Sequence, residues 1–175
     1  MTTFELIKHL EIDEAFQGIN LTEFHFSNDT PLPDRQLVDN FIHSKHFTSD
    51  CLRDIIKNNT ENQPFLRQAF ENSIITSNDF KKLTKSEIVT FFDDFGNQED
   101  WGDTDIYDFI TLKNKFIHLI KDIRVDTFYF INKDWFDKTD TRVRQPENEI
   151  FIYYFLILWL DETKNTLTIT EWTYD

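Results

Sequence analysis

Residues 150–160 read IFIYYFLILWL, a run of apolar side chains without a single charge. A helix that crosses a bilayer needs about 20 such residues, so this run is too short to span a membrane. A strand that is covered on both sides has this composition, because neither of its alternating faces meets water. The run therefore predicts a central β-strand, and the fold must supply a covering layer on each face of it.

The segments around this run complete a sheet. Residues 161–165 read DETKN, a polar hairpin loop, and residues 166–174 alternate aliphatic side chains with threonines, as a half-exposed strand does. Residues 125–131 are dense in β-branched and aromatic side chains and predict a third strand. Successive strand residues point to opposite faces, so Tyr153 and Tyr154 should separate. A structural role, in cross-strand pairs or the core, is expected for the aromatic set Tyr153, Tyr154, Trp159, Trp172 and Tyr174.

The first two-thirds of the chain predicts mostly short amphipathic helices. Residues 3–17 carry Leu6, Ile7 and Leu10 at helical spacing, and Gly18 is a natural helix stop. A short strand is expected at 21–26. The apolar residues of the other expected helices fall within the ranges 37–42, 52–56, 66–74, 88–95 and 106–120.

The helix that follows Thr84 has the clearest local signals. Thr84 and Glu87 have the spacing of a capping box, in which the side chain of each residue accepts a hydrogen bond from the backbone amide of the other. Phenylalanines follow at helical spacing, and Gly96 marks the end. The next helix, expected from about 104 to 121, carries acidic residues in its first turn and Lys121 in its last, which suits the helix dipole.

These elements predict the α+β class: a cluster of short helices in about 1–122, packed on an antiparallel sheet in about 123–175. The sheet's expected strands lie near 125–131, 150–160 and 166–174. A single domain over 1–175 is expected, because three glycines and four prolines leave no linker between the two parts.

The composition limits the classes of function. With 32 acidic residues against 18 basic ones, the net charge is −14, and such a surface repels nucleic acid and anionic membranes. Disorder is not expected despite this charge, because 39% of the residues are hydrophobic and 19 are phenylalanine. The charge thus favours cations or a basic protein as partners.

The single cysteine and the N-terminal sequence bear on the compartment. Cys51 has no second cysteine in the chain to pair with, so the fold does not depend on an oxidising compartment. The first residues, MTTFELIKHL, lack the basic segment and the apolar core of a signal peptide. A cytoplasmic protein without a membrane segment is expected.

Acid is concentrated in one segment between two predicted helices. It contains no lysine or arginine and holds seven acidic residues: Asp93, Asp94, Glu99, Asp100, Asp103, Asp105 and Asp108. A solvated loop and a contact surface for a basic partner are the two main interpretations, and the aromatic residues Trp101 and Tyr107 favour a contact surface.

A calcium-binding helix-loop-helix is the third interpretation of this segment. Placing Gly102 at the sixth loop position puts Asn97, Glu99 and Asp108 at positions one, three and twelve. The fifth position is then Trp101, which cannot coordinate a metal, and the twelfth is not the usual bidentate Glu. The sequence therefore predicts no calcium site.

The histidines give a weaker indication of a metal. His43 and His46 are three residues apart, with Asp39, Asp50 and Cys51 nearby. A closed transition-metal site needs three or four ligands in one geometry, and an expected helix break separates these candidates. Surface histidines at a helix end are the preferred interpretation, and no metal or other cofactor is predicted.

No catalytic motif is present in the sequence. It contains no Gly-x-Ser-x-Gly elbow, no Walker loop and no dinucleotide fingerprint. No catalytic residue is therefore predicted. A basic group in the polar stretch before the central strand is expected to be solvated or to pair with the protein's own acidic surface: Lys133, Lys138, Arg142 and Arg144.

The leading hypothesis is an acidic protein-binding module that docks on a basic partner and neutralises it. Immunity proteins, antitoxins and phage inhibitors of nucleic-acid-binding enzymes have this physical profile, because opposite charge speeds encounter. The candidate partner-binding residues are Asp94, Glu99, Asp100, Trp101, Asp103, Asp105, Tyr107 and Asp108.

Three alternatives remain open at this point. The first is an enzyme or small-ligand binder with a pocket between the C-terminal sheet and the helices. The second is a subunit of a larger complex. The third concerns assembly: if the helices leave Trp172 and Tyr174 exposed, the last strand offers an edge for a homodimer.

Overall fold

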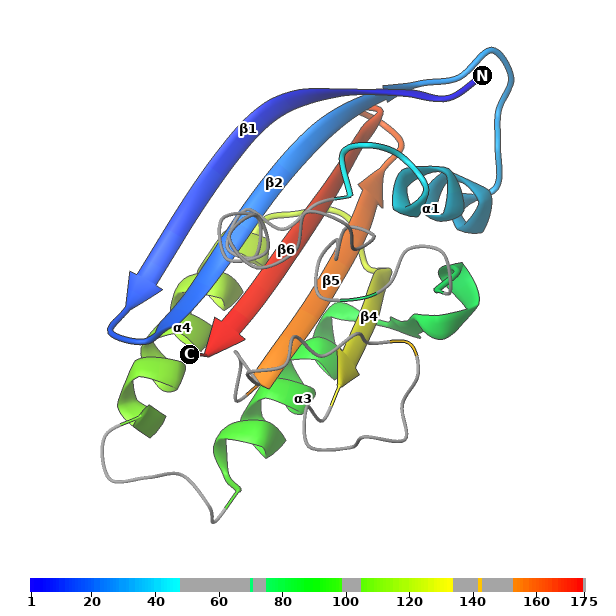
Figure 1. Cartoon of the computed structure of the whole chain (residues 1–175). Helices are drawn as coiled ribbons and strands as arrows, with labels where there is room; N and C mark the ends of the chain where they lie inside the picture. Colours follow the sequence, from blue (N-terminus) through cyan, green and yellow to red (C-terminus); the bar gives the residue numbers. More distant parts are fainter. Residues whose placement is uncertain (48–69, 71–74, 99–104, 134–141, 143–152, 175) are drawn as a thin grey trace, which may run out of the picture.

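The fold is built on one antiparallel sheet, seen in a computed structural model that describes residues 1–47, 70, 75–98, 105–133, 142 and 153–174. The six strands lie in the order β1-β2-β6-β5-β4-β3 (Figure 1). Their bounds are β1 Thr3–Glu14, β2 Gln17–Ser27, β3 Lys81–Leu83, β4 Phe128–Lys133, β5 Tyr153–Asp161 and β6 Thr166–Tyr174. The helical elements described are α1 Asp34–Ile42, the short 3-10 helix η1 Ser77–Asp79, α3 Lys85–Gly96 and α4 Asp105–Lys121.

The predicted central strand is confirmed. β5 pairs with β6 on one side and β4 on the other, and each of its residues is buried. The 161–165 segment is the predicted hairpin loop, in which the Asp161 carboxylate accepts a hydrogen bond from the Thr163 amide at 3.1 Å. Continuous apolar sequence thus marks the strand with neighbours on both edges and layers on both faces.

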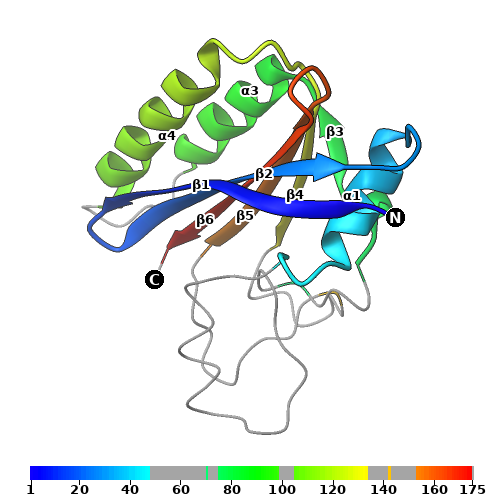
Figure 2. The same cartoon turned by 90° about the horizontal axis from the view of Figure 1, so that it is seen from above.

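The two faces of the sheet carry different helices. Figure 2 shows α3 and α4 together on one face and α1 on the other. Tyr153 belongs to the core beneath α3 and α4, and Tyr154 to the core beneath α1. The predicted separation of these two tyrosines is therefore confirmed, and both cores have a share of the sheet's aromatic residues.

Stacked aromatic rings hold α3 and α4 to the sheet. The Trp172 ring stacks on Phe92 of α3, with ring centroids 4.4 Å apart, and lies edge-on to Phe116 of α4 at 5.2 Å. Phe92 and Phe155 also meet edge to face at 6.0 Å. Aromatic pairs at these separations add about 0.5–1.5 kcal/mol each beyond the burial of their area. The predicted structural role of the C-terminal aromatics is confirmed for Trp172.

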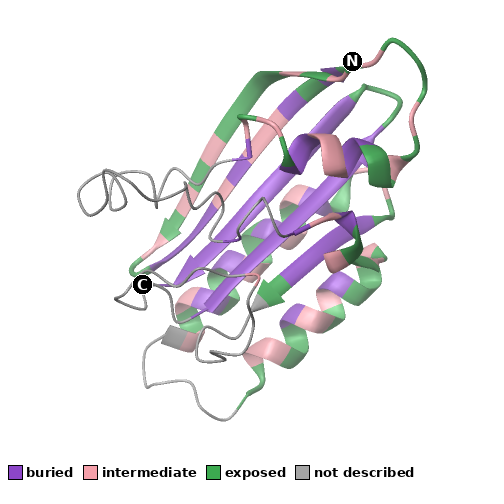
Figure 3. Ribbon diagram, turned by 45° about the vertical axis from the view of Figure 1, so that its right-hand side comes forward, coloured by how far each residue is buried: buried purple, intermediate pink, exposed green. Residues whose placement is uncertain are grey.

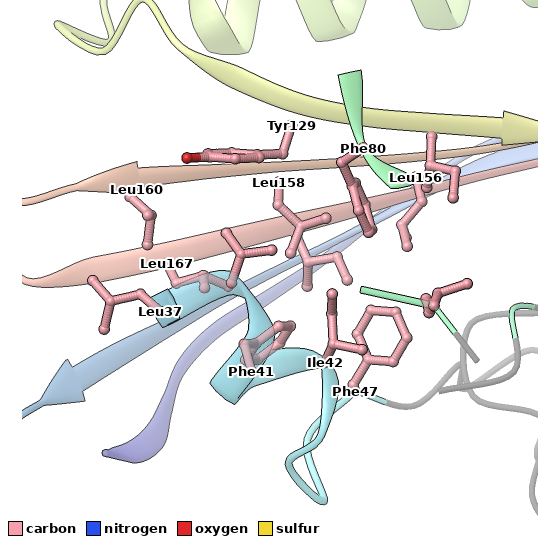
Figure 4. Packing of buried hydrophobic residues seen from close by; sticks show 14 of the residues in the cluster. Leu37, Phe41, Ile42, Phe47, Phe80, Tyr129, Leu156, Leu158, Leu160 and Leu167 are labelled. Atoms are coloured by element: carbon pink, nitrogen blue, oxygen red, sulfur yellow. The ribbon is translucent and has the colours of Figure 1, made fainter. Parts of the chain in front are cut away.

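Helix α1 covers the opposite face through one apolar stripe. Leu37, Phe41 and Ile42 are buried on it and point at the sheet, where Leu158 and Leu160 face them (Figure 4). Their spacing is that of an amphipathic helix. The helix predicted at this position is confirmed, whereas that predicted around 52–56 and most of that around 66–74 lie outside the described residues.

The helix predicted over residues 3–17 is wrong, because this segment is strand β1 and the turn after it. β1 pairs along its length with β2, so the N-terminal part of the chain also contributes to the sheet. The pairing register shifts between Leu6 and Lys8, which makes Ile7 an extra residue in a β-bulge. The bulge places two apolar residues side by side and changes the face of those that follow, so the pattern imitates helical spacing. Gly18, the expected helix stop, lies inside β2.

Dimerisation through the last strand is not supported. β6 lies between β2 and β5, so neither of its edges is free, and Trp172 and Tyr174 are buried. Among the described strands, the free edges of the sheet are those of β1 and β3 instead. Figure 3 shows the contrast: the central strands are buried, whereas most of β1 is exposed or half-buried.

The turn between β1 and β2 contains a strained residue. Ala15 has φ 50°, in the left-handed region that glycine tolerates and alanine does not. Ala15→Gly should raise the free energy of unfolding by about 0.5 to 1 kcal/mol, the relief of strain minus the entropy that glycine adds to the unfolded chain. Urea denaturation measures it. Asn165→Gly, at φ 52°, is the control and should gain less, because asparagine tolerates this region. A destabilised Ala15→Gly protein would contradict this geometry.

Candidate functional site

A capping box fixes where helix α3 begins, and the length of the helix fixes where its acidic last turn lies. The Thr84 amide and hydroxyl donate to the Glu87 carboxylate at 2.7 and 2.8 Å, and the Glu87 amide donates to the Thr84 hydroxyl at 3.3 Å. The predicted box is confirmed. The helix ends at Gly96, where the Asn97 amide still donates to the Asp93 carbonyl at 3.1 Å. Asp93 and Asp94 therefore occupy the last turn.

Gly96 lets the last turn of α3 approach the first turns of α4. A Cβ atom at this position would lie 3.2 Å from the Phe109 ring and 3.9 Å from the side chain of Ile106. The smaller distance is tighter than ordinary van der Waals contact, so a side chain here would push the two helices apart. The C-terminal end of α3, which carries Asp94, thus lies at the same end of the helical layer as the beginning of α4, which carries Tyr107 and Asp108 (Figure 1).

The first turns of α4 present an aromatic side chain to solvent. Tyr107 is 72% exposed, more than is usual for an aromatic side chain in a packed helical layer. Asp108, beside it, is half-buried and lies near Tyr153 of β5. Burial raises the pKa of Tyr153 far above its ordinary range, and the charges of Tyr174 and Asp108 add to this effect. Tyr153 is therefore a buried, neutral tyrosine of the core, whereas Tyr107 is an exposed tyrosine on the surface.

The acidic groups at this end differ in whether a cation balances them. Asp93 is neutralised within the helical layer by Lys113 of α4, with 2.7 Å between Nζ and the carboxylate oxygen. Within the described part of the chain, neither Asp94 nor Asp108 forms an ion pair. These two carboxylates thus contribute unbalanced negative charge on either side of Tyr107 in sequence.

A second exposed aromatic residue, Phe16, lies at this end of the sheet, although the sequence does not predict it as part of the site. It forms the β1–β2 turn with Ala15 and is 69% exposed. Its neighbour Gln17 accepts a hydrogen bond from the Tyr153 hydroxyl at 2.6 Å. Figures 1 and 2 both place this turn beside the beginning of α4. A sequence signal exists, since a bulky apolar residue stands two positions before Gly18, but the helix predicted over 3–17 conceals it.

The predicted site residues divide into two groups. Asp94 lies in the last turn of α3, Tyr107 and Asp108 lie in the first turn of α4, and Asp105 is the first residue of α4. Four others lie outside the described residues: Glu99, Asp100, Trp101 and Asp103. We call the group Asp94, Tyr107, Asp108 and Phe16 the acidic end.

Metal chemistry finds no support in the described residues. None of their histidine, cysteine, aspartate and glutamate side chains gather in threes around a common point. The Asp39 carboxylate instead accepts hydrogen bonds from the Ser77 amide and hydroxyl at 2.6 and 3.0 Å, and the His43 ring contacts the Asp39 carbonyl at 2.8 Å. His46 packs against Phe24, and burial, with the charge of Lys45, lowers its pKa. The remaining candidates, Asp50 and Cys51 and the centre of the calcium loop, lie outside the described residues.

The basic group contributes one internal ion pair among the described residues. Arg142 lies 3.9 Å from the carboxylate of Asp79, which confirms pairing with the protein's own acidic surface at this one position. Lys133 ends β4, and Lys138 and Arg144 lie outside the described residues. Arg142, whose side chain the structure describes, thus pairs with an acidic residue of its own chain.

Two adjoining hollows lie away from the acidic end, beside the loop between β2 and α1. Their volumes are about 400 and 520 Å³, and they share the lining residues Asn28, Asp29, Thr30 and Leu32. The Oδ1 atom of Asn28 is buried and accepts no hydrogen bond from the described residues. Glu162 lines one hollow, and the neighbouring Asp34 carboxylate raises its pKa. Within the part of the chain that the structure describes, these hollows give the small-ligand alternative a place at the rim of the sheet.

The capping box offers a direct test of how α3 is anchored. Thr84→Ala should lower the free energy of unfolding by about 1 kcal/mol, whereas Thr90→Ala, in the exposed interior of the same helix, should not destabilise. Hydrogen bonds from the Thr84 amide, and then its hydroxyl, lower the pKa of Glu87. A lowered carboxyl pKa gives stability that is present above the unfolded value and is lost as the pH falls through the folded one. The deficit of Thr84→Ala, measured by urea denaturation, should therefore shrink below about pH 4. A constant deficit would exclude Glu87 from the box.

Two further findings bear on what kind of protein this is. In the part of the chain that the structure describes, no helix combines the length and the apolar character needed to cross a membrane. Comparison of the chain with protein families, with characterised proteins and with solved structures found no match in any of the three.

Proposed function

We propose that this protein is an acidic binding module that docks on a basic partner protein and neutralises it. The observation that carries the proposal is the aromatic ring of Tyr107, which is 72% exposed and stands in sequence between two carboxylates, Asp94 and Asp108, that no described cation balances. The exposed ring of Tyr107 is not part of the packed core. Trp172 and its neighbours already hold the helices to the sheet, so an exposed tyrosine among uncompensated charges is available for contact.

The charges and the aromatic rings would do different work in such a complex. A net charge of −14 steers a cationic protein toward this one and raises the rate of encounter, an effect that salt weakens. Aromatic residues then supply the buried centre of an interface, since tyrosine is enriched among the residues whose truncation costs most. Tyr107 and Phe16 are the exposed aromatics at the acidic end, and Asp94 and Asp108 would form its charged rim.

Neutralisation would follow from occlusion. A partner that binds nucleic acid has a cationic surface, and a carboxylate-rich surface competes for the same lysines and arginines. Immunity proteins, antitoxins and phage inhibitors act on partners of this kind, and that is the class of function we infer. No covalent chemistry by this chain is required.

Affinity capture tests the proposal. The native protein and the variant Asp94→Lys/Asp108→Lys serve as baits in an extract of the source cells. A control bait, Asp122→Lys/Glu5→Lys, has the same net charge but changes exposed residues away from the acidic end. We expect the native and control baits to retain the same basic protein and the first variant to lose it. Equal loss by both variants would show that only overall charge matters, equal retention by all three baits would remove the acidic end from the interface, and retention of no basic protein would reject the proposal.

The hollows beside the β2–α1 loop favour a second candidate, a small-ligand-binding protein. The unsatisfied Oδ1 of Asn28 is an acceptor for a ligand's N–H or O–H group. A ligand that binds only the folded state raises the melting temperature. A thermal-shift screen of metabolites distinguishes the two candidates: a hit whose effect Asn28→Ala abolishes would favour ligand binding, and a screen without a hit leaves the binding module as the better account.

A further inference from the structure

The two free edges of the described sheet are unlike each other. β3 exposes an edge of three residues, Lys81–Leu83, and two of them are exposed lysines. Short, lysine-rich edges are a common protection against pairing with other chains. β1 exposes an edge of 12 residues, Thr3–Glu14, on which no described strand pairs. Among the described strands, only β1 therefore offers a long template for a further strand.

The bulge at Ile7 divides this edge into a short half, Thr3–Leu6, and a long half, Lys8–Glu14. From Lys8 to Glu14, the strand pairs residue by residue with β2, ending at Gln17. The seven residues Lys8–Glu14 read KHLEIDE. A bulge limits how far another strand can follow the edge, so we expect pairing from outside in the long half, which offers seven consecutive residues.

The side chains of this half alternate between the two faces of the sheet. Leu10 and Ile12 pack against the core beneath α3 and α4, so Lys8 and Glu14 share their face. The residues that alternate with these four lie on the opposite face: His9, Glu11 and Asp13. There the His9 ring contacts the Thr22 hydroxyl of β2 at 2.9 Å and the Glu11 carboxylate of its own strand at 3.0 Å. Lys8 itself forms no ion pair within the described residues.

We propose that two copies of this chain pair antiparallel through this half of β1, with the two-fold axis at Glu11. Residues directly opposite each other in an antiparallel pair lie on the same face of the sheet. Even-numbered residues of one copy must therefore lie opposite even-numbered residues of the other, and odd opposite odd. With the axis at Glu11, Lys8 meets Glu14 of the second copy and Leu10 meets Ile12, each twice by symmetry. The sheet then continues from one copy into the other.

Neighbouring registers lack this complementarity. An axis at Leu10 places Lys8 opposite Ile12, and an axis at Ile12 places Leu10 opposite Glu14. On the other face, the axis at Glu11 brings His9 opposite Asp13 of the second copy. Its cost is one like-charge contact between the two Glu11 side chains, and each of these already contacts His9 of its own chain at 3.0 Å.

The pairing leaves the acidic end free. Because the strands run antiparallel, the two β1–β2 turns, and with them Phe16 and the beginning of α4, lie on opposite sides of the axis. A dimer would carry two acidic ends and bind two partners. This inference does not rest on the proposed function, since either copy alone has a complete acidic end.

Charge exchange tests the register. In Lys8→Glu, both symmetry-related ion pairs become repulsive, and the same holds for Glu14→Lys, so each variant should dimerise at least about tenfold more weakly than the native chain. Mixed in equal amounts, the two variants should form a heterodimer, because the introduced glutamate of one then meets the introduced lysine of the other and the second pair is native. Sedimentation velocity across a wide concentration range at about 0.15 M salt, where long-range repulsion is screened, measures the native chain, each variant and the mixture.

Two controls keep the result interpretable. Glu5→Lys changes a charge of the same strand on the far side of the bulge and should leave dimerisation unchanged. Glu14 also pairs with Lys115 of its own chain, so circular dichroism must first show that Glu14→Lys is folded. A native protein that stays monomeric throughout, a Lys8→Glu variant that dimerises like the native chain, or a mixture without heterodimers would overturn the proposal.

Discussion

Replacing Trp172 with alanine should lower the free energy of unfolding by about 3 to 5 kcal/mol, the range for large aromatic residues deleted from a core. Trp172 has no solvent exposure and stands where the sheet meets both helices of one layer. It stacks on Phe92 with 4.4 Å between ring centroids and meets Phe116 edge-on at 5.2 Å. Alanine would leave a cavity beneath both α3 and α4. Urea denaturation followed by circular dichroism measures the loss.

Trp172→Phe is the matched control for this prediction. The indole Nε1 is buried without a hydrogen-bond acceptor among the described residues, so phenylalanine removes an unsatisfied donor while keeping a ring for Phe92 to stack on. It should cost clearly less than alanine. If Trp172→Ala lost no more than about 0.5 kcal/mol, as exposed substitutions do, the helical layer would not be packed on the sheet in this way.

Replacing Tyr107 with alanine should weaken binding of the captured basic partner by about 30-fold, which corresponds to about 2 kcal/mol for an aromatic residue at the centre of an interface. The free energy of unfolding should change little, because 72% of this side chain is exposed. The two readouts together separate contact from fold. Isothermal titration calorimetry measures the affinity and urea denaturation the stability.

Leu6→Ala provides the comparison for Tyr107→Ala. Leu6 is also exposed, at 56%, but it lies in the short half of β1 before the bulge, away from the acidic end. Its truncation should leave the affinity unchanged. An affinity that survives Tyr107→Ala would remove this residue from the interface, and Phe16→Ala would then show whether the other exposed aromatic at this end contributes instead.

The part of the fold that can be predicted is the part whose signals are local. The run at 150–160 is apolar on both alternating faces, and a strand that is covered on both faces has that pattern. The capping box at Thr84 likewise needs no tertiary context, because its hydrogen bonds form within four residues. The strand predicted at 125–131 lies slightly further along the chain, at Phe128–Lys133, since strand ends depend on the neighbouring strand.

The N-terminal hairpin cannot be predicted in this way, because its pattern is interrupted. Leu6 and Ile7 are adjacent apolar residues only because the bulge inserts one of them. Beyond it, Leu10 and Ile12 face the layer of α3 and α4, so no single period describes the segment. The bulge is defined by the pairing of β1 with β2, and this pairing cannot be recognised from the sequence of β1 alone. Without the hairpin, the exposure of Phe16 cannot be predicted either.

The acidic residues and Tyr107 of the acidic end can be predicted from the sequence, whereas Phe16 and the geometry of this end come from packing. The concentration of acid between two helices is visible in the sequence, and so is Tyr107. That Lys113 neutralises Asp93 and leaves Asp94 unbalanced depends on how α3 lies against α4. Gly96, which permits that approach, is recognisable in sequence only as a helix stop.

The central claim, that the acidic end binds a basic protein, is tested most directly by titrating the captured partner into the native chain, Asp94→Lys/Asp108→Lys and Asp122→Lys/Glu5→Lys at two salt concentrations. The two variants have equal net charge, so the comparison isolates position. The account predicts that the acidic-end variant binds at least about tenfold more weakly and loses most of its salt dependence, while the control binds almost as the native chain does. Equal weakening of both variants would contradict it.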